Sequence, residues 1–215
     1  MELTALAWMS QAPCAVPEQL RAVEFGAISW QAMILDGVAR HVWGGLAIAA
    51  DLTETPDIRA SAVHDLVPPR GVVGRAAAAW VHAGGPLPGR IEVIVAPRAR
   101  RPDPHPLRVP HESALTASDV VVVGPLRVTS VARTALDVAR WSGPDDSGQL
   151  LESLVRCAGL DATHALGLLD ALPGHPKTRA AREVMLALGG VRPAPGELSP
   201  GSSGSRRARC RPANR

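Results

Sequence analysis

The chain has 215 residues, of which 46% are apolar, and its formal net charge is +3. This apolar content is sufficient for a hydrophobic core, which excludes a chain that is disordered throughout. The tail Leu198–Arg215 holds five arginines and no acidic residue, so the rest of the chain is close to neutral. The net charge by itself therefore does not indicate binding to nucleic acid.

The three cysteines are widely spaced and form no C-x-x-C pair, which predicts neither a disulfide framework nor a zinc site. Glu2 stands where a secretory signal would carry positive charge, and the apolar run Leu3–Met9 is too short to cross a membrane. We therefore expect a cytoplasmic protein that has no membrane partner.

The first 52 residues have the element order of a winged helix-turn-helix. The apolar spacing of Glu18–Phe25 predicts a short helix, and Ser29 is a candidate N-cap for a second helix that ends at Leu35. Val38–Ala49 predicts two strands around the pair Gly44-Gly45, which is typical of a tight hairpin.

The following residues alternate between helical and strand patterns. Helices are expected at 55–66, 72–82, 131–141, 148–158, 163–172 and 177–188, and strands at 90–96, 107–111, 120–123 and 126–128. We expect 107–111 to return beside 90–96 and 120–123 to be buried. Ser130 is a candidate N-cap, and the four-residue spacing of Arg133 and Asp137 permits an ion pair of about 0.2–0.5 kcal/mol.

The sequence thus predicts an α+β protein in three parts. Residues 1–52 form a winged-helix-like module, residues 53–190 form a mixed α/β domain with a small sheet and C-terminal helices, and residues 191–215 form a disordered tail rich in Arg, Pro and Ser.

The signatures of common catalytic sites are missing. The chain has no G-x-S-x-G elbow, and its single lysine, Lys177, lies in neither a phosphate-binding loop nor an acidic E-x-K site. His111, Glu112 and Ser113 are consecutive, and consecutive residues of a strand point to opposite faces, so we expect no catalytic convergence. We expect no catalytic residue, no metal site and no cofactor.

Several segments in this order resemble AbiEi-type proteins of actinobacteria, the antitoxins of type IV toxin–antitoxin systems. They are DGVARHVWGGL from Asp36 to Leu46, GVVGRAAAAW from Gly71 to Trp80, and VTSVARTALD from Val128 to Asp137. The most specific match is T-S-x-x-R-T-x-x-D between Thr129 and Asp137, and the resemblance extends over about residues 17–190.

The resemblance implies a winged helix that binds operator DNA and regulates transcription, followed by a domain for antitoxicity or further DNA contact. It also implies a functional counterpart, a nucleotidyltransferase-type toxin that is neutralised without a stable direct complex. Some members of the family continue into a restriction-like endonuclease domain. After Gly190 this chain has only its Pro/Ser/Arg tail, with no acidic or lysine site of that kind.

The residues expected to contact DNA come from three places. Ser29, Trp30 and Gln31 would face the major groove, Arg40 and His41 would contact phosphate from the wing, and Arg98, Arg100 and Arg101 would form an auxiliary basic turn. Pro17–Ala50 carries only two basic residues against three acidic ones, so the expected DNA affinity is weak to moderate.

Two other functions remain open. The poor basic content of the first module favours a non-catalytic interaction protein whose degenerate winged helix serves packing or dimerisation. The third possibility is a nuclease relative that has lost its active-site domain, for which we expect no metal-dependent cleavage. For Trp30, the alternative to a DNA contact is a structural role, in which its side chain packs against the wing.

Overall fold

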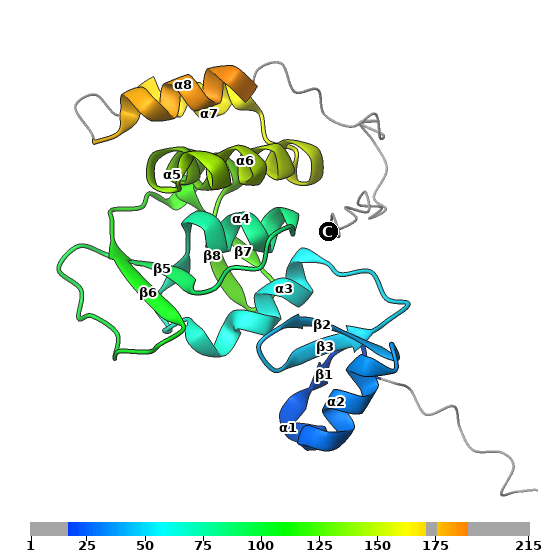
Figure 1. The fold of residues 1–215 in the computed structure, drawn as a ribbon. Helices are drawn as coiled ribbons and strands as arrows, with labels where there is room; N and C mark the ends of the chain where they lie inside the picture. Colours follow the sequence, from blue (N-terminus) through cyan, green and yellow to red (C-terminus); the bar gives the residue numbers. More distant parts are fainter. Residues whose placement is uncertain (1–16, 171–175, 189–215) are drawn as a thin grey trace, which may run out of the picture. The chain divides into compact units, whose positions relative to one another are not determined.

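The computed structural model describes residues 17–170 and 176–188 (Figure 1). The chain divides into two compact units, Met1–Leu52 and Thr53–Arg215. The described residues combine helices with small sheets, which confirms the predicted α+β class. The predicted tail, residues 191–215, lies outside the described residues.

The N-terminal unit is a small antiparallel sheet with two helices. Its elements are β1 (Leu20–Arg21), α1 (Ala22–Phe25), α2 (Ala27–Leu35), β2 (Ala39–Trp43) and β3 (Leu46–Ala49). The strand order is β1-β3-β2, so the last strand lies in the centre. The expected hairpin is confirmed, with Gly44 at φ +56° in the turn between β2 and β3.

The expected helix over Glu18–Phe25 is wrong in its first half. Leu20 and Arg21 form β1 and pair with Ala47 and Leu46 of β3, so only the last four residues are helical. The pairing with β3 overrides the local helical spacing.

The second helix begins two residues before the expected N-cap. Gly26 has φ +73°, a conformation that glycine adopts without strain, and this turn lets α2 start directly at Ala27. Ser29 therefore lies inside the helix rather than at its cap.

The core of the N-terminal unit is small. Leu20, Ala39 and Ala47 are buried, and three partly buried side chains of α2 pack against them: Trp30, Met33 and Ile34. The expectation that Trp30 packs toward the hairpin agrees with this cluster, because Ala39 and Ala47 belong to the hairpin strands.

The described part of the C-terminal unit contains a five-stranded mixed sheet, six α-helices and two short 3₁₀ turns. In chain order these are α3 (Pro56–Val63), η2 (His64–Leu66), β4 (Val72–Val73), α4 (Arg75–Ala83), β5 (Ile91–Val95), β6 (Arg108–Glu112), η3 (Ala117–Asp119), β7 (Val120–Val123), β8 (Leu126–Thr129), α5 (Val131–Trp141) and α6 (Pro144–Ala158). Two more helices, α7 (Ala162–Asp170) and α8 (Thr178–Leu188), bring the described α-helices of this unit to six.

The strand order of this sheet is β6-β5-β4-β8-β7. β4 pairs antiparallel with β5 and parallel with β8, and β7 pairs antiparallel with β8. The predicted helix over residues 72–82 divides into the short strand β4 and the buried helix α4, because Val72 and Val73 are taken into the sheet.

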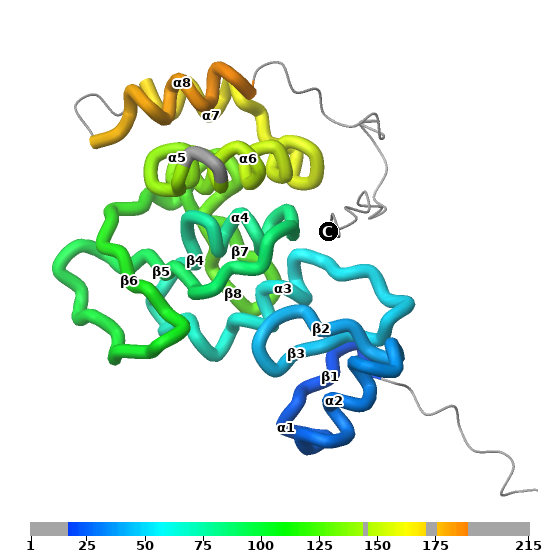
Figure 2. Tube along the Cα trace, in the orientation of Figure 1, coloured from blue at the N-terminus to red at the C-terminus, as the bar shows by residue number. Residues whose placement is uncertain are grey.

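The prediction that residues 107–111 return antiparallel beside β5 is wrong in the direction of the strand. β6 pairs parallel with β5, from Ile91 opposite Arg108 to Val95 opposite Glu112. Figure 2 shows the long loop between the two strands, which carries the chain back before β6 begins. Alternation of side chains specifies the faces of a strand but not its direction, so the sequence pattern did not distinguish the two pairings.

The expected burial of 120–123 is also wrong. β7 is the last strand of the sheet order, and its Val121 and Val122 are 38% and 76% exposed. An edge strand has only one neighbour to cover it, so its valines remain partly in water.

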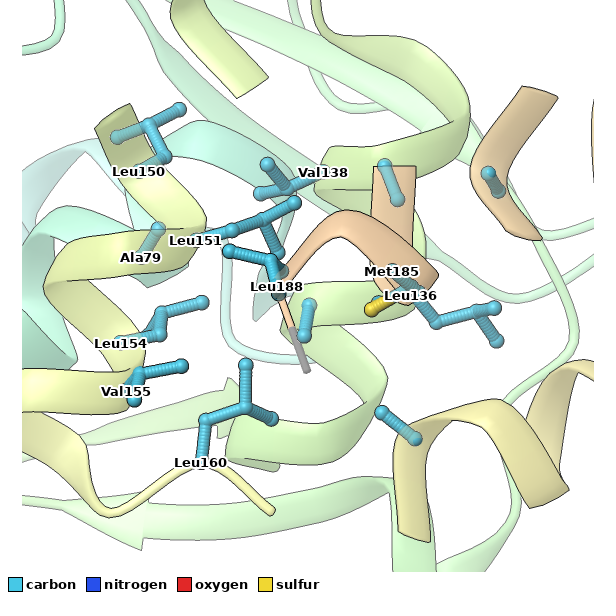
Figure 3. Close-up of a cluster of buried hydrophobic side chains, with 14 of the residues drawn as sticks. Ala79, Leu136, Val138, Leu150, Leu151, Leu154, Val155, Leu160, Met185 and Leu188 are labelled. Atoms are coloured by element: carbon cyan, nitrogen blue, oxygen red, sulfur yellow. The ribbon is translucent and has the colours of Figure 1, made fainter. Parts of the chain in front are cut away.

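The main hydrophobic core of the C-terminal unit lies between its helices (Figure 3). Ala79 and Ala83 of α4 contribute small side chains, and α6 contributes the fully buried Leu151 and Leu154. Met185 of α8 closes the same cluster from the end of the described chain. Figure 1 shows the resulting layers, with α7 and α8 over α5 and α6, and α4 beneath them.

The helices α3 and α5 of this unit each begin with a side-chain N-cap, and the one at Ser130 confirms the prediction. The Thr55 hydroxyl accepts a hydrogen bond from the Ile58 backbone N–H (3.3 Å) at the start of α3. The Ser130 hydroxyl accepts one from Arg133 N–H (3.4 Å) at the start of α5. No helix among the described residues is both long enough and apolar enough to cross a membrane.

Candidate functional site

The exposed face of α2 is apolar rather than basic. Ile28 and Leu35 are 87% and 75% exposed, and together with Ala27, Gln31 and Ala32 they line an open surface depression. Of the residues predicted to face the major groove, Ser29 and Gln31 are exposed, whereas Trp30 packs into the core. The helix thus offers two polar side chains for base contacts and no cationic one.

The two wing residues, Arg40 and His41, differ in how far their side chains are exposed to solvent. Arg40 on β2 is half-buried, and its guanidinium donates a hydrogen bond to the Leu52 carbonyl (2.9 Å). His41 is exposed, with its Nε2 2.6 Å from the Gly44 carbonyl oxygen. A phosphate contact from Arg40 would compete with its bond to the end of this unit.

The basic turn after β5 is exposed. Arg98, Arg100 and Arg101 all present more than a third of their surface to solvent, and none of the three side chains has an ion pair within the part of the chain that is described. Arg98 has φ +62°, and its backbone N–H donates to Glu112 Oε1 (2.9 Å). The end of β6 therefore anchors the start of the turn.

The motif residues between Thr129 and Asp137 form a buried polar network. Arg133 Nε donates to Asp137 Oδ2 (2.9 Å), and its terminal nitrogens reach Asp119 Oδ2 (3.4 Å) and Ser113 Oγ (3.1 Å). The expected Arg133–Asp137 ion pair is confirmed, with side chains 11% and 4% exposed. Arg133 thus connects α5 to the segment after β6 and to η3.

The two threonines of the motif, Thr129 and Thr134, form hydrogen bonds at the junction of β8 and α5. The hydroxyls of Thr129 and Thr134 are 2.6 Å apart, and Thr134 Oγ1 also donates to the Thr129 carbonyl (3.1 Å). Both residues are fully buried. The hydroxyl groups therefore satisfy each other where β8 turns into α5, so the motif specifies this turn and the packing of α5.

Burial dominates the electrostatics of Asp137. It raises the pKa of this carboxyl, although the cations of Arg133, Arg140 and Arg75 pull the pKa down. The loss of water around the pair therefore outweighs the attraction between its charges. The energetic importance of Arg133 and Asp137 lies in the cost of leaving either one unpaired.

A cavity of about 270 Å³ adjoins this network. It lies among α4, α5 and the end of β6, and seven of its lining residues carry charged, imidazole or indole groups: Arg75, His111, Glu112, Arg133, Asp137, Arg140 and Trp141. Ser113 lines it too, so all three residues of the histidine-glutamate-serine run reach one cavity. They share this cavity although they are consecutive, because β6 ends at Glu112 and strict alternation ends with it.

The three residues nevertheless have separate partners. His111 Nε2 lies 3.3 Å from Glu92 Oε1, Glu112 binds the Arg98 N–H, and the Ser113 hydroxyl accepts from Arg133. They form no chain of hydrogen bonds from nucleophile to base, which a catalytic triad requires. Within residues 17–170 and 176–188, no group of three His, Cys, Asp or Glu side chains is placed to hold a metal ion.

Sequence reasoning did not find Arg75, Arg140 and Trp141 as site residues. Arg75 lies far from the other two in the chain, and only the packing of α4 against α5 brings them together. The available signal was weak: an arginine next to a tryptophan at the end of a strongly amphipathic helix.

Comparisons with known proteins do not assign this chain to a family. No protein-family model matches it, and no curated protein matches it.

Proposed function

We propose that this chain is a DNA-associated regulatory protein of the AbiEi antitoxin type. Two features support the proposal: the order β1-α1-α2-β2-β3 with a central β3, which is similar to that of a winged helix-turn-helix, and the exposed arginines after β5. The resemblance adds a nucleotidyltransferase-type toxin as the functional counterpart. The proposal includes no catalytic role for the chain.

The observation that carries the proposal is the exposed turn with Arg98, Arg100 and Arg101. Three guanidinium groups without ion pairs among the described residues are suited to the phosphates of a DNA backbone, because each contact releases a counterion. Since α2 presents an apolar face, most of the binding energy comes from phosphate contacts, and discrimination between base sequences is low.

The experiment is a fluorescence-anisotropy titration of the full chain with duplex DNA at low salt. One duplex has the sequence upstream of its own coding region, and a second has an unrelated sequence. We expect binding at micromolar protein and a loss of roughly tenfold or more in affinity when Arg98, Arg100 and Arg101 are all replaced with alanine, since three phosphate contacts disappear.

The matched control replaces Arg70, Arg127 and Arg179, three other exposed arginines, and removes the same formal charge. The control protein should bind as the wild type does. Equal losses in the two triple variants, or no binding by the wild type at micromolar concentration, would contradict the proposal.

A second candidate function is favoured by the exposed face of α2. Ile28 and Leu35 are 87% and 75% exposed, and this apolar surface is suited to contact with another protein surface, including a second copy of the chain. The chain would then be a non-catalytic interaction protein.

Analytical ultracentrifugation tests this second candidate. If the chain associates through α2, the wild type forms a concentration-dependent dimer. The variants Ile28→Glu and Leu35→Glu should not form this dimer, because each substitution would bury a carboxylate in the contact. Val122→Glu is the matched control, since Val122 is 76% exposed on β7. A monomeric wild type at the highest concentration reached would exclude self-association through α2.

A further inference from the structure

Positive charge gathers around one aromatic ring at the edge of the cavity. The guanidinium carbons of Arg75 and Arg140 lie 5.0 and 5.3 Å from the centre of the Trp141 ring, and Lys177 Nζ lies 5.0 Å from it. Cation–π contacts hold each cation in place but do not neutralise it. Three like charges around a single ring repel one another unless an anion lies between them.

Arg140 is the buried member of this group that has no ion pair among the described residues. Its side chain is buried, with the residue 7% exposed, and it donates from Nε to the Pro176 carbonyl (3.2 Å). Within the described chain no carboxylate lies at ion-pairing distance from it. Burial lowers the pKa of Arg140, Asp137 opposes this effect, and the neighbouring Arg133 and Arg75 lower the pKa further.

The carboxylates near the cavity already have partners. Asp137 is bound by Arg133, and Glu112 by the Arg98 backbone N–H. Glu92 accepts a hydrogen bond from the Ala76 backbone N–H (2.9 Å) at the start of α4, and its other oxygen faces Arg75 Nη1 at 3.7 Å. Of the three arginines in the lining, Arg133 is bound to Asp137 and Arg75 faces Glu92, so Arg140 is the one without a carboxylate at ion-pairing distance in the described chain.

His111 adds an unused polar atom. Its Nε2 is buried and, although it lies 3.3 Å from Glu92 Oε1, it makes no hydrogen bond of good geometry. A buried nitrogen without a hydrogen bond is energetically unfavourable, so a ligand that accepts a bond from it is favoured.

Arg75 is held in a strained backbone conformation. Its φ is +53°, in the left-handed region that is unfavourable for a non-glycine residue. Glycine would relieve this strain, but only a long cationic side chain at this position reaches both Glu92 and Trp141. Strain of this kind is common where a residue is kept for binding.

We propose that this cavity binds a small oxyanion, a phosphate ion or the terminal phosphate of a small metabolite, through Arg75, Arg140 and His111. Guanidinium groups match the oxygens of a phosphate with paired hydrogen bonds. The volume of about 270 Å³ lies just below the roughly 300–1,000 Å³ of sites for drug-sized ligands, so the cavity suits a small anion and is too small for a DNA duplex. The proposal does not depend on DNA binding.

The test is a titration of the full chain with inorganic phosphate and with methyl phosphate, at constant ionic strength kept with chloride. Two-dimensional ¹H–¹⁵N NMR follows the indole N–H of Trp141 and the Nε–H groups of Arg75 and Arg140. The expected result is a saturable shift of these signals. A linear, non-saturating change up to 50 millimolar phosphate would overturn the proposal.

Isothermal titration calorimetry then compares two variants with the wild type. Arg140→Gln should weaken phosphate binding at least tenfold, and Arg127→Gln, the same change at an exposed position on β8, should leave it unchanged. His111→Gln should weaken phosphate binding as well, and it replaces Arg140→Gln in the experiment if that variant does not fold. Unchanged affinity in the folded pocket variant would overturn the assignment.

Two further arms separate this site from the DNA contact. The variant with Arg98, Arg100 and Arg101 replaced should still bind phosphate with wild-type affinity. Saturating duplex DNA should leave bound phosphate in place; displacement by DNA would overturn the assignment to a small anion. Failure of DNA binding by the wild type, with saturable phosphate binding intact, would count only against the proposed function.

Discussion

Replacement of Asp137 with alanine is expected to destabilise the C-terminal unit by about 3–5 kcal/mol, the usual cost of removing one partner of a buried ion pair. The side chain of Asp137 is 4% exposed and that of Arg133 is 11% exposed, so the arginine left behind has little access to water. Urea denaturation followed by circular dichroism measures the loss as a lower unfolding midpoint.

A second pair in the same unit provides the control. Glu152 and Arg156 have the same i, i+4 spacing on α6, but their side chains are 47% and 54% exposed. Glu152→Ala is expected to cost only about 0.3–0.5 kcal/mol, because water screens the pair. Equal losses for Asp137→Ala and Glu152→Ala would contradict the description of the network as buried.

The double variant Arg133→Met with Asp137→Leu completes the experiment. It should be more stable than Asp137→Ala, since it leaves no charge of the pair behind. The single variants Arg133→Met and Asp137→Leu complete the cycle, and a loss in the double variant equal to the sum of their losses would show that the two residues are energetically independent.

Replacement of Leu151 with alanine is the second change with a large expected effect, about 2–5 kcal/mol of lost stability. Leu151 is fully buried in the interhelical cluster of Figure 3, where its removal leaves a cavity among α4, α5 and α6. Leu186→Ala is the matched control, since Leu186 is 61% exposed on α8 and its truncation should change stability by no more than about 0.5 kcal/mol.

The same denaturation experiment measures both leucine variants. A loss below about 1 kcal/mol for Leu151→Ala, or similar losses at the two positions, would mean that the helices do not pack as a single core.

The helix α5 was predictable because its determinants are local. Its N-cap Ser130, its apolar stripe and the Arg133–Asp137 spacing all lie within one short segment of the chain. Interactions between residues three or four positions apart determine such a helix, so a short stretch of sequence is enough to predict it.

The strands were less predictable because strand pairing is not local. Leu20 has helical neighbours in sequence, yet it belongs to a strand through its contact with Ala47. The direction of β6 depends on where the loop of residues 96–107 leads the chain. Neither property is encoded in a window of a few residues.

The candidate sites show the same division. The exposed turn with Arg98, Arg100 and Arg101 was evident from its composition. The oxyanion cavity was not, because it joins Arg75 of α4 to Arg140 of α5 only after the helices have packed. The motif between Thr129 and Asp137, which carried the resemblance, forms internal hydrogen bonds and thus relates to the fold more directly than to a function.

The central claim is that the exposed arginines after β5 bind DNA phosphates, and the salt dependence of DNA affinity tests it most directly. Each lost phosphate contact reduces the slope of log affinity against log salt by about 1, so replacing Arg98, Arg100 and Arg101 together should reduce it by about 3. The control with Arg70, Arg127 and Arg179 replaced should keep the wild-type slope. An identical slope in the wild type and the Arg98, Arg100 and Arg101 variant would contradict the claim.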